Sequence, residues 1–198
     1  MAYTKTTTED LPISFRKTLQ KEEKSRIADA ALELIKEGET IYLDAGTTTF
    51  ALAAKLSVFR HLTILTNDID IAYEIAHHTE NDLIVAGGLL KKSSVTLMGM
   101  FTEKMLSELY VDKAFLAADA INIETGYMDY NTDEIPLKRT MINNSKQHII
   151  LCDHSKFQNT AFMSICPISA IDLTITGKEI DPEIVQKMLD AGAAVKLV

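Results

Sequence analysis

Short apolar segments rich in β-branched residues alternate with helix-like patterns along most of this 198-residue chain. This alternation restricts the chain to an α/β fold, because the strands of a parallel sheet are joined through crossover helices. Predicted strands lie at residues 41–44, 62–66, 83–86, 111–118, 148–152, 172–176 and 195–198, with predicted helices at about 22–37, through 56, at 69–78, about 133–144 and 182–190. We therefore predict a mostly parallel sheet with helices on both faces.

Polar residues and glycines follow five of the predicted strands. The carboxyl ends of parallel strands meet at one edge of a sheet, and ligands bind beyond that edge. The candidates, in chain order, are Asp44 with Gly46, Thr47, Thr48 and Thr49; Thr66, Asn67 and Asp68; Gly87 and Gly88; Asp119; and Asp153, Ser155 and Lys156. We expect one pocket to be built from these strand ends.

The segment from Asp44 to Thr49 reads Asp-Ala-Gly-Thr-Thr-Thr and leads from the first strand into a helix. Gly46 permits a tight turn, and the three threonines stand where the helix begins. Free backbone N–H groups, the helix dipole and the hydroxyls can converge there on an anion, which in an α/β protein is expected to be a phosphate. The alternative is an ordinary helix start with threonine caps.

The other strand ends also have two interpretations each. Asn67 could orient a hydroxyl or the phosphate, or it could belong to the cap of the next helix. Gly87 and Gly88 allow a ligand to approach the backbone closely, but a Gly-Gly pair is also an ordinary turn. Lys156 is a natural donor to phosphate or sugar oxygens, while its segment, which begins at Asp153, could equally be a solvated loop.

Glu134 and Lys138 lie four residues apart near the start of the helix predicted at 133–144. This spacing fits a surface ion pair worth roughly 0.3 kcal/mol. In the functional interpretation, Glu134 faces sugar hydroxyls and Lys138 faces an acidic group. The polar segment at 122–132 is predicted to be a loop that could act as a lid.

Composition and charge exclude several classes of protein. Hydrophobic residues make up 46% of the chain, which allows a full core, and no membrane-spanning run or signal-peptide core is recognisable. The net charge of −8 argues against nucleic-acid binding by this chain alone, because phosphate backbones attract basic surfaces. Cys152 and Cys166 form no disulfide framework, so we expect a cytoplasmic protein.

Motifs for nucleophilic catalysis, cofactors or metals are not recognisable. His154 has no second histidine at metal-ligand spacing, and the adjacent His77 and His78 point in different directions on a helix. A Gly-x-Ser-x-Gly elbow and the P-loop and dinucleotide fingerprints are absent from the sequence. We predict no catalytic residue, no cofactor and no metal.

A family resemblance is carried by the order and spacing of weak motifs across about 160 residues. The carriers are Arg16, Glu23, Lys24, Ile27, Ala28, Leu34, Ile35, Gly38, Gly99, Glu134, Lys138 and Arg139, with residues 43–48, 65–67, 86–88, 112–115, 153–156 and 175–176. Together they resemble the effector domain of DeoR-type bacterial transcriptional repressors, between about residues 15 and 176.

The resemblance implies a fold similar to ribose-5-phosphate isomerase and an effector that is a phosphorylated sugar. We assign the phosphate to Asp44, Gly46, Thr47, Thr48, Thr49 and Lys156, and the sugar to Thr66, Asn67, Gly87, Gly88, Asp119, Glu134, Lys138 and Asp153. The Asp-His-Ser-Lys stretch at 153–156 is similar to that of lactose-phosphotransferase-type repressors, whose effector is a ketohexose phosphate.

The family also implies homodimers or homotetramers that bind operator DNA through an N-terminal winged helix-turn-helix. We expect residues 1–14 to be a linker remnant and 15–198 to be the sensor domain, with the DNA-binding domain missing. The sequence departs from the family at residues 119–121, where a glycine is common, and at Gly177, where an aspartate is common. The first departure bears on the sugar-facing loop.

A sugar-phosphate isomerase of the same fold is the alternative. Such an enzyme needs a general base of tuned pKa beside the substrate carbonyl, and Glu134 and Asp119 are the candidates. The isomerase pattern of a Gly-rich stretch followed by a catalytic glutamate is not found after Gly87 and Gly88, where Leu-Leu-Lys-Lys follows. The sequence therefore favours a sensor over an enzyme.

Overall fold

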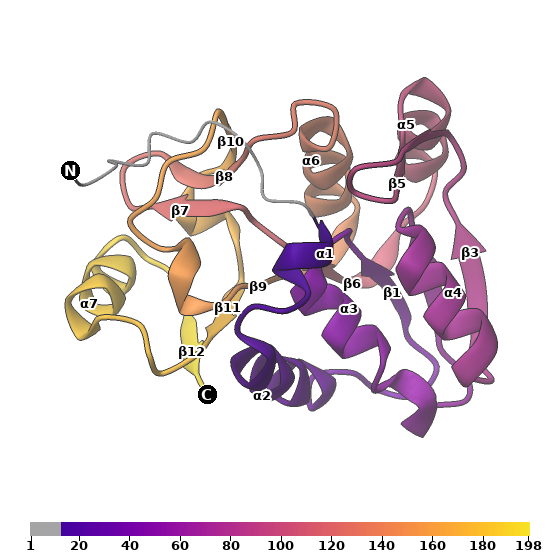
Figure 1. The fold of residues 1–198 in the computed structure, drawn as a ribbon, viewed down its shortest axis with the longest axis horizontal. Coiled ribbons are helices and arrows are strands. Elements are labelled where there is room, and N and C mark those ends of the chain that lie inside the picture. Colours follow the sequence, from indigo (N-terminus) through magenta and orange to yellow (C-terminus); the bar gives the residue numbers. More distant parts are fainter. Residues whose placement is uncertain (1–12) are drawn as a thin grey trace.

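A seven-stranded parallel sheet forms the centre of the computed structural model, which describes residues 13–198 (Figure 1). Its strands are β1 (Thr40–Leu43), β2 (Thr63–Thr66), β3 (Asp82–Val85), β6 (Val111–Leu116), β9 (Ser145–Leu151), β11 (Leu173–Thr176) and β12 (Val195–Leu197). They run in the order β12-β11-β9-β6-β1-β2-β3, and each neighbouring pair is parallel. These are the seven strands predicted from the sequence, so the fold class is confirmed.

Three helices cover each face of the sheet. One face carries α2 (Lys21–Leu32), α3 (Thr47–Ala53) and α4 (Ile69–His78), and the other carries α5 (Met100–Ser107), α6 (Ile135–Asn143) and α7 (Pro182–Asp190). Alternate side chains of each strand enter opposite cores: Ile41 and Leu43 pack with α2 and α3, whereas Tyr42 packs with α5 and α6. Burial on both faces explains why these strands read as continuous apolar runs.

A small antiparallel sheet joins β7 (Ala120–Asn122), β8 (Gly126–Asp129) and β10 (Met163–Cys166) beyond the end of β6. The prediction of a loop at 122–132 is therefore wrong at residue 122 and at residues 126–129, which lie in strands. Gly126 turns the hairpin with φ of 85°, and a Cβ atom there would meet the backbone of Cys166. The strands are too short for their alternation to be visible in the sequence.

A second hairpin, β4 (Leu89–Lys91) and β5 (Thr96–Met98), precedes α5 and was not predicted. Gly88 brings this hairpin close to α5, because a Cβ atom at Gly88 would meet the hydroxyl of Thr102 and would lie 2.6 Å from the Met98 carbonyl oxygen. Gly87 accepts a hydrogen bond of 2.8 Å from the same Thr102 hydroxyl. The Gly-Gly pair is thus part of the packing of this region.

Helix ends differ from the predictions in three places. α2 ends at Leu32, five residues before the predicted end, because i to i+3 hydrogen bonds tighten the chain from Leu34 onward. α3 ends at Ala53 and a 3-10 turn (Leu56–Val58) follows, while α6 begins at Ile135 with Pro136 in its first turn.

α1 (Ile13–Arg16) begins the described part of the chain, so two residues of the predicted linker are helical. The rest of that prediction, at residues 1–12, lies outside the described residues. Among the helices described, none has the length and apolar character needed to cross a membrane.

Candidate functional site

A cavity lies at the carboxyl ends of β1, β6 and β9, the edge where the sequence predicted a pocket. Seven of the fourteen predicted site residues line it: Gly46, Thr47, Thr48, Asp119, Glu134, Lys138 and Lys156. They come from the turn after β1, the segment after β6, the start of α6 and the short helix after β9. Residues more than a hundred positions apart therefore face one cavity.

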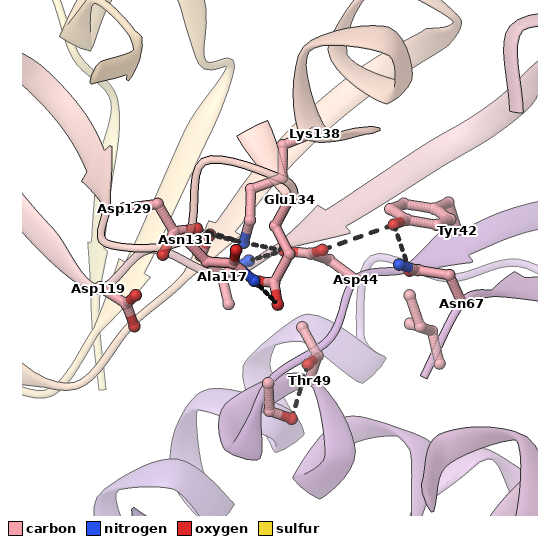
Figure 2. A network of polar contacts seen from close by, with 12 residues as sticks. Tyr42, Asp44, Thr49, Asn67, Ala117, Asp119, Asp129, Asn131, Glu134 and Lys138 are labelled. Atoms are coloured by element: carbon pink, nitrogen blue, oxygen red, sulfur yellow. Dashed lines mark hydrogen bonds and ion pairs between the residues drawn. The ribbon is translucent and has the colours of Figure 1, made fainter. Parts of the chain in front are cut away.

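Lys138 is the central cation of the site, although its side chain is only 2% exposed (Figure 2). Its Nζ atom lies 2.5 Å from Asp44 Oδ2 and 3.1 Å from Asp129 Oδ2, and it donates to the Ala117 carbonyl at 2.9 Å. Burial lowers the pKa of Lys138, but the carboxylates of Asp129, Asp44 and Glu134 outweigh burial and raise it above its usual value. The expected surface ion pair with Glu134 is therefore wrong.

Asp44 lies behind the cavity wall. Its Oδ2 atom also accepts a hydrogen bond of 2.9 Å from the Ala117 backbone N–H, and its Oδ1 atom lies 3.5 Å from the Tyr42 hydroxyl. The carboxylate thus joins the end of β1 to the end of β6 and holds Lys138 in place. Asp44 is not among the residues that line the cavity.

Asp119 and Asp129 form a pair of acids at the start of the small sheet and the end of its β8 strand. Burial raises the pKa of Asp129; Lys138 opposes this, Asp119 adds to it, and the result is a pKa well above the usual value. Burial also disfavours ionised Asp119, but a hydrogen bond from Asp129 and the cations Arg16, Lys156 and Lys138 hold its pKa below the usual value. The two neighbouring acids thus have pKa values that are displaced in opposite directions.

Glu134 is the third acid that faces the cavity. Its Oε1 atom accepts a hydrogen bond of 2.6 Å from Asn131 Nδ2. Burial raises its pKa, while Lys138 acts in the opposite direction. Because Asp119, Asp129 and Glu134 present oxygens to one space, this side of the cavity suits a ligand with several hydroxyl groups.

The turn after β1 forms the opposite side of the cavity, where Gly46, Thr47 and Thr48 line it at the start of α3. A Cβ atom at Gly46 would lie 2.9 Å from the Ala117 Cβ, so glycine permits β1 and β6 to approach closely here. Thr49 is fully buried, and its hydroxyl donates to the Gly46 carbonyl at 2.9 Å. Thr47 and Thr48 therefore face the cavity, whereas Thr49 stabilises the turn.

Two further predicted residues, Thr66 and Asn67, hold the end of β2 in place. The Thr66 hydroxyl donates to the Leu43 carbonyl at 2.8 Å. Asn67 accepts a hydrogen bond of 2.7 Å from the Tyr42 hydroxyl (Figure 2). It also donates to the Leu97 carbonyl at 3.0 Å. Neither residue is among those that line the cavity, and both instead hold the strand ends behind it in place.

Asp153, Gly87 and Gly88 also lie outside the cavity lining. Asp153 caps the 3-10 helix His154–Lys156 by accepting a hydrogen bond of 3.1 Å from the Ser155 N–H, and it lies 4.0 Å from the Lys24 ammonium group. The aspartate thereby orients the short helix that carries Lys156 to the cavity.

Several lining residues were missed in the sequence. Ile13 and Arg16 come from α1, Ser94 and Thr96 come from the β4–β5 hairpin, and Asp129 comes from β8. All belong to short elements that have no recognisable periodicity. The one available signal was Asp129, an acid at the end of an apolar three-residue run.

Glu23, His154 and Glu179 are a possible metal-donor group within the described part of the chain. Glu23 Oε1 accepts hydrogen bonds from the backbone N–H groups of His154 at 2.7 Å and Gly177 at 3.1 Å, while Oε2 lies 2.7 Å from His154 Nδ1. These contacts occupy the buried carboxylate and fasten α2 to the ends of β9 and β11. The prediction of no metal stays a prediction.

A comparison with known families matches residues 19–178 to the DeoR C-terminal sensor domain. This chain belongs to the DeoR sensor-domain family. Among curated relatives, it is 34% identical to the HTH-type transcriptional regulator GolR of Listeria innocua, over 89% of this chain and 69% of the relative. It is 31% identical to the glycerol-3-phosphate regulon repressor of Escherichia coli, over 88% of this chain and 69% of that relative. The family resemblance and the expectation of a regulatory domain, not an enzyme, are confirmed.

The chain spans about two thirds of the length of these relatives, and 65% of the putative aga operon transcriptional repressor of Escherichia coli O157:H7, to which it is 32% identical. Solved structures with a similar fold include ribose-5-phosphate isomerase A from Methanocaldococcus jannaschii, with a TM-score of 0.50 and 19% identity over 69% of this chain and 54% of that one. The translation initiation factor eIF-2B from Pyrococcus horikoshii also has a similar fold, with a TM-score of 0.51. The two chains are 16% identical, and the match covers 72% of this chain and 50% of that one. At these identities the likeness shows the fold alone.

Proposed function

We propose that the cavity binds a phosphorylated sugar and that the chain is the effector sensor of a transcriptional regulator. The observation that carries the proposal is that two kinds of polar group line one cavity. Gly46, Thr47 and Thr48 line it together with the cation Lys156, and the acids Asp119, Asp129 and Glu134 line it as well. Backbone N–H groups, hydroxyls and a cation suit a phosphate, whereas carboxyl oxygens suit sugar hydroxyls.

In this proposal the fourteen predicted site residues, together with Asp129, divide into two layers. The inner layer touches the effector: Gly46, Thr47, Thr48 and Lys156 at the phosphate, and Asp119, Asp129 and Glu134 at the hydroxyls. The outer layer holds the inner one in position and comprises Asp44, Thr49, Thr66, Asn67, Gly87, Gly88, Lys138 and Asp153. Effector specificity then depends on the acid side, because sugar phosphates differ chiefly in their hydroxyl groups.

Regulation of DNA binding is proposed to act through a helix-turn-helix part of the regulator, the feature for which relatives are named. With a net charge of −8, the chain itself lacks the basic balance that operator binding needs. Relatives are named HTH-type transcriptional regulators, and the matched family is the C-terminal part of such proteins. A homodimer or homotetramer in the cytoplasm fits this role, and the effector must prefer one arrangement of the assembly in order to regulate it.

A thermal-shift panel of matched pairs tests the proposed function. Fructose 6-phosphate, ribose 5-phosphate and glycerol 3-phosphate are each compared with fructose, ribose and glycerol. We expect at least one phosphorylated compound to raise the melting temperature while its free partner at the same concentration does not, because binding to the folded state stabilises it. Equal stabilisation by both members of every pair, or by neither, contradicts a phosphate-binding cavity.

A further inference from the structure

α1 closes one side of the cavity, although it lies before the first strand of the sheet. Ile13 and Arg16 line the cavity together with Thr47, Thr48 and Lys156. The Arg16 side chain is 17% exposed, and its guanidinium lies 3.3 Å from Asp119 Oδ1. Figure 1 shows α1 near the N-terminal end of α3, close to the middle of the molecule. A cation from the N-terminal segment therefore shares the cavity with the proposed effector ligands.

The walls leave about 30 Å³ for water, which holds about two molecules. The sheet ends and α3 are fixed by the two buried cores, whereas the described side chains of α1 are not part of them. α1 is therefore a wall that can shift without disturbing either core.

The attachments of α1 are polar. Phe15 is 52% exposed, and the described side chains of α1 belong to neither large core cluster. A helix of four residues has little stability of its own. Lys24, whose side chain is buried, donates to the carbonyls of Arg16 at 2.8 Å and Leu19 at 2.9 Å. These two bonds hold the C-terminal end of α1. The Arg16 side chain makes a separate contact with Asp119.

The charges favour an exchange of partners at Arg16. A guanidinium binds a phosphate through parallel hydrogen bonds, and a phosphate monoester carries more negative charge at neutral pH than one carboxylate. A phosphate beside Thr48 and Lys156 would therefore compete with Asp119 for Arg16. The exchange would also release an Asp119 oxygen for a sugar hydroxyl.

We propose that Arg16 is an effector-binding residue and that α1 is the element through which occupancy of the cavity moves the chain that precedes it. The proposal rests on the proposed function, because it needs an anionic effector in this cavity. When the Arg16 guanidinium exchanges Asp119 for the phosphate, the N-terminal part of α1 moves. The C-terminal end of α1 stays in place, because Lys24 holds the carbonyls of Arg16 and Leu19. In a longer regulator, the segment before α1 leads toward the DNA-binding part, so the movement couples the two.

Calorimetric titration tests the binding role of Arg16, with the tightest of fructose 6-phosphate, ribose 5-phosphate and glycerol 3-phosphate as probe. Arg16→Gln is expected to weaken binding at least about 10-fold, because it removes charge-assisted hydrogen bonds to the phosphate. Lys17→Gln is the matched control: Lys17 is the next residue, pairs with Asp70 at 2.5 Å and does not line the cavity. It should bind within about 2-fold of the wild type. Arg16→Lys keeps the charge and is expected to show intermediate affinity.

Hydrogen exchange in the wild-type chain tests the movement. We expect the probe, but not its free sugar, to change amide exchange at residues 13–20. Wild-type affinity in both Arg16→Gln and Arg16→Lys, or unchanged exchange in this segment during saturation, overturns the proposal while leaving the proposed function intact. A wild-type chain that binds no sugar phosphate contradicts the proposed function itself, and the role of Arg16 falls with it.

Discussion

Lys138 carries an ammonium group into the interior at the carboxyl edge of the sheet, between the carboxylates of Asp44 and Asp129. Ions in such a position are costly to bury and need partners on every side. The Ala117 carbonyl completes the set, so four chain segments meet at one nitrogen atom. The geometry of the cavity therefore depends on a residue that the sequence presented as half of a surface ion pair.

Replacement of Lys138 by methionine is expected to lower the free energy of unfolding by about 3 kcal/mol, because it leaves two buried carboxylates without their cation. Urea denaturation at pH 7 measures the change. Lys146→Met provides the control, since Lys146 also pairs with an aspartate, at 2.7 Å, but its side chain is 79% exposed. The control should change stability by no more than about 0.5 kcal/mol. Similar effects of the two substitutions would contradict the account of Lys138.

The buried carboxyl group of Asp68 predicts that the stability of the protein depends on pH. Burial raises its pKa to about 7, although its side chain caps α4 by accepting a hydrogen bond of 2.9 Å from the Ile71 N–H. The folded state then binds more protons than the unfolded state between about pH 4 and 7, so stability falls as the pH rises through this window. Asp68→Asn retains a capping oxygen and loses the titration.

Urea denaturation at pH 5 and pH 8 checks this expectation. The decrease in unfolding free energy from pH 5 to pH 8 should be smaller in Asp68→Asn than in the wild type by at least about 1 kcal/mol. Identical decreases in the two proteins would show that Asp68 does not hold its proton in the folded state.

The seven strands of the large sheet could be predicted because each is apolar on both sides, and most of its helices show their periodicity. The two hairpins, α1 and α5 were not predicted, because these short segments lack the continuous apolar run or the helical period that marks the other elements. Those short elements bring Arg16, Thr96 and Asp129 to the cavity. The sequence therefore predicted the edge on which the cavity lies, and half of the predicted site residues line it.

The neighbouring glycines Gly87 and Gly88 allow a test of whether this pair serves packing or ligand binding. A Cβ atom at Gly88 would collide with Thr102 and the Met98 carbonyl, whereas one at Gly87 would have no atom within 4 Å. We expect Gly88→Ala to lower stability by about 1–3 kcal/mol through overpacking, and Gly87→Ala to be near neutral. Chemical denaturation of both variants measures this difference, and equal stabilities would contradict the packing role.

The whole molecule places its ligand cavity between a rigid sheet and a weakly held N-terminal helix. The sheet supplies the fixed geometry that recognition needs, since its strands are buried on both faces. In the proposal above, α1 supplies the movable wall. A sensor needs both properties, because an effector regulates only if it binds two states of the molecule unequally.

Calorimetric titration of the wild type, Thr48→Glu and Ser57→Glu with the tightest sugar phosphate tests the central claim most directly. Thr48 lines the cavity, whereas Ser57 is exposed and does not line it. A carboxylate at position 48 should weaken binding by at least about 100-fold through repulsion of the phosphate, while the same charge at position 57 should leave affinity unchanged. Wild-type affinity in a folded Thr48→Glu protein would contradict the assignment of the phosphate to this turn.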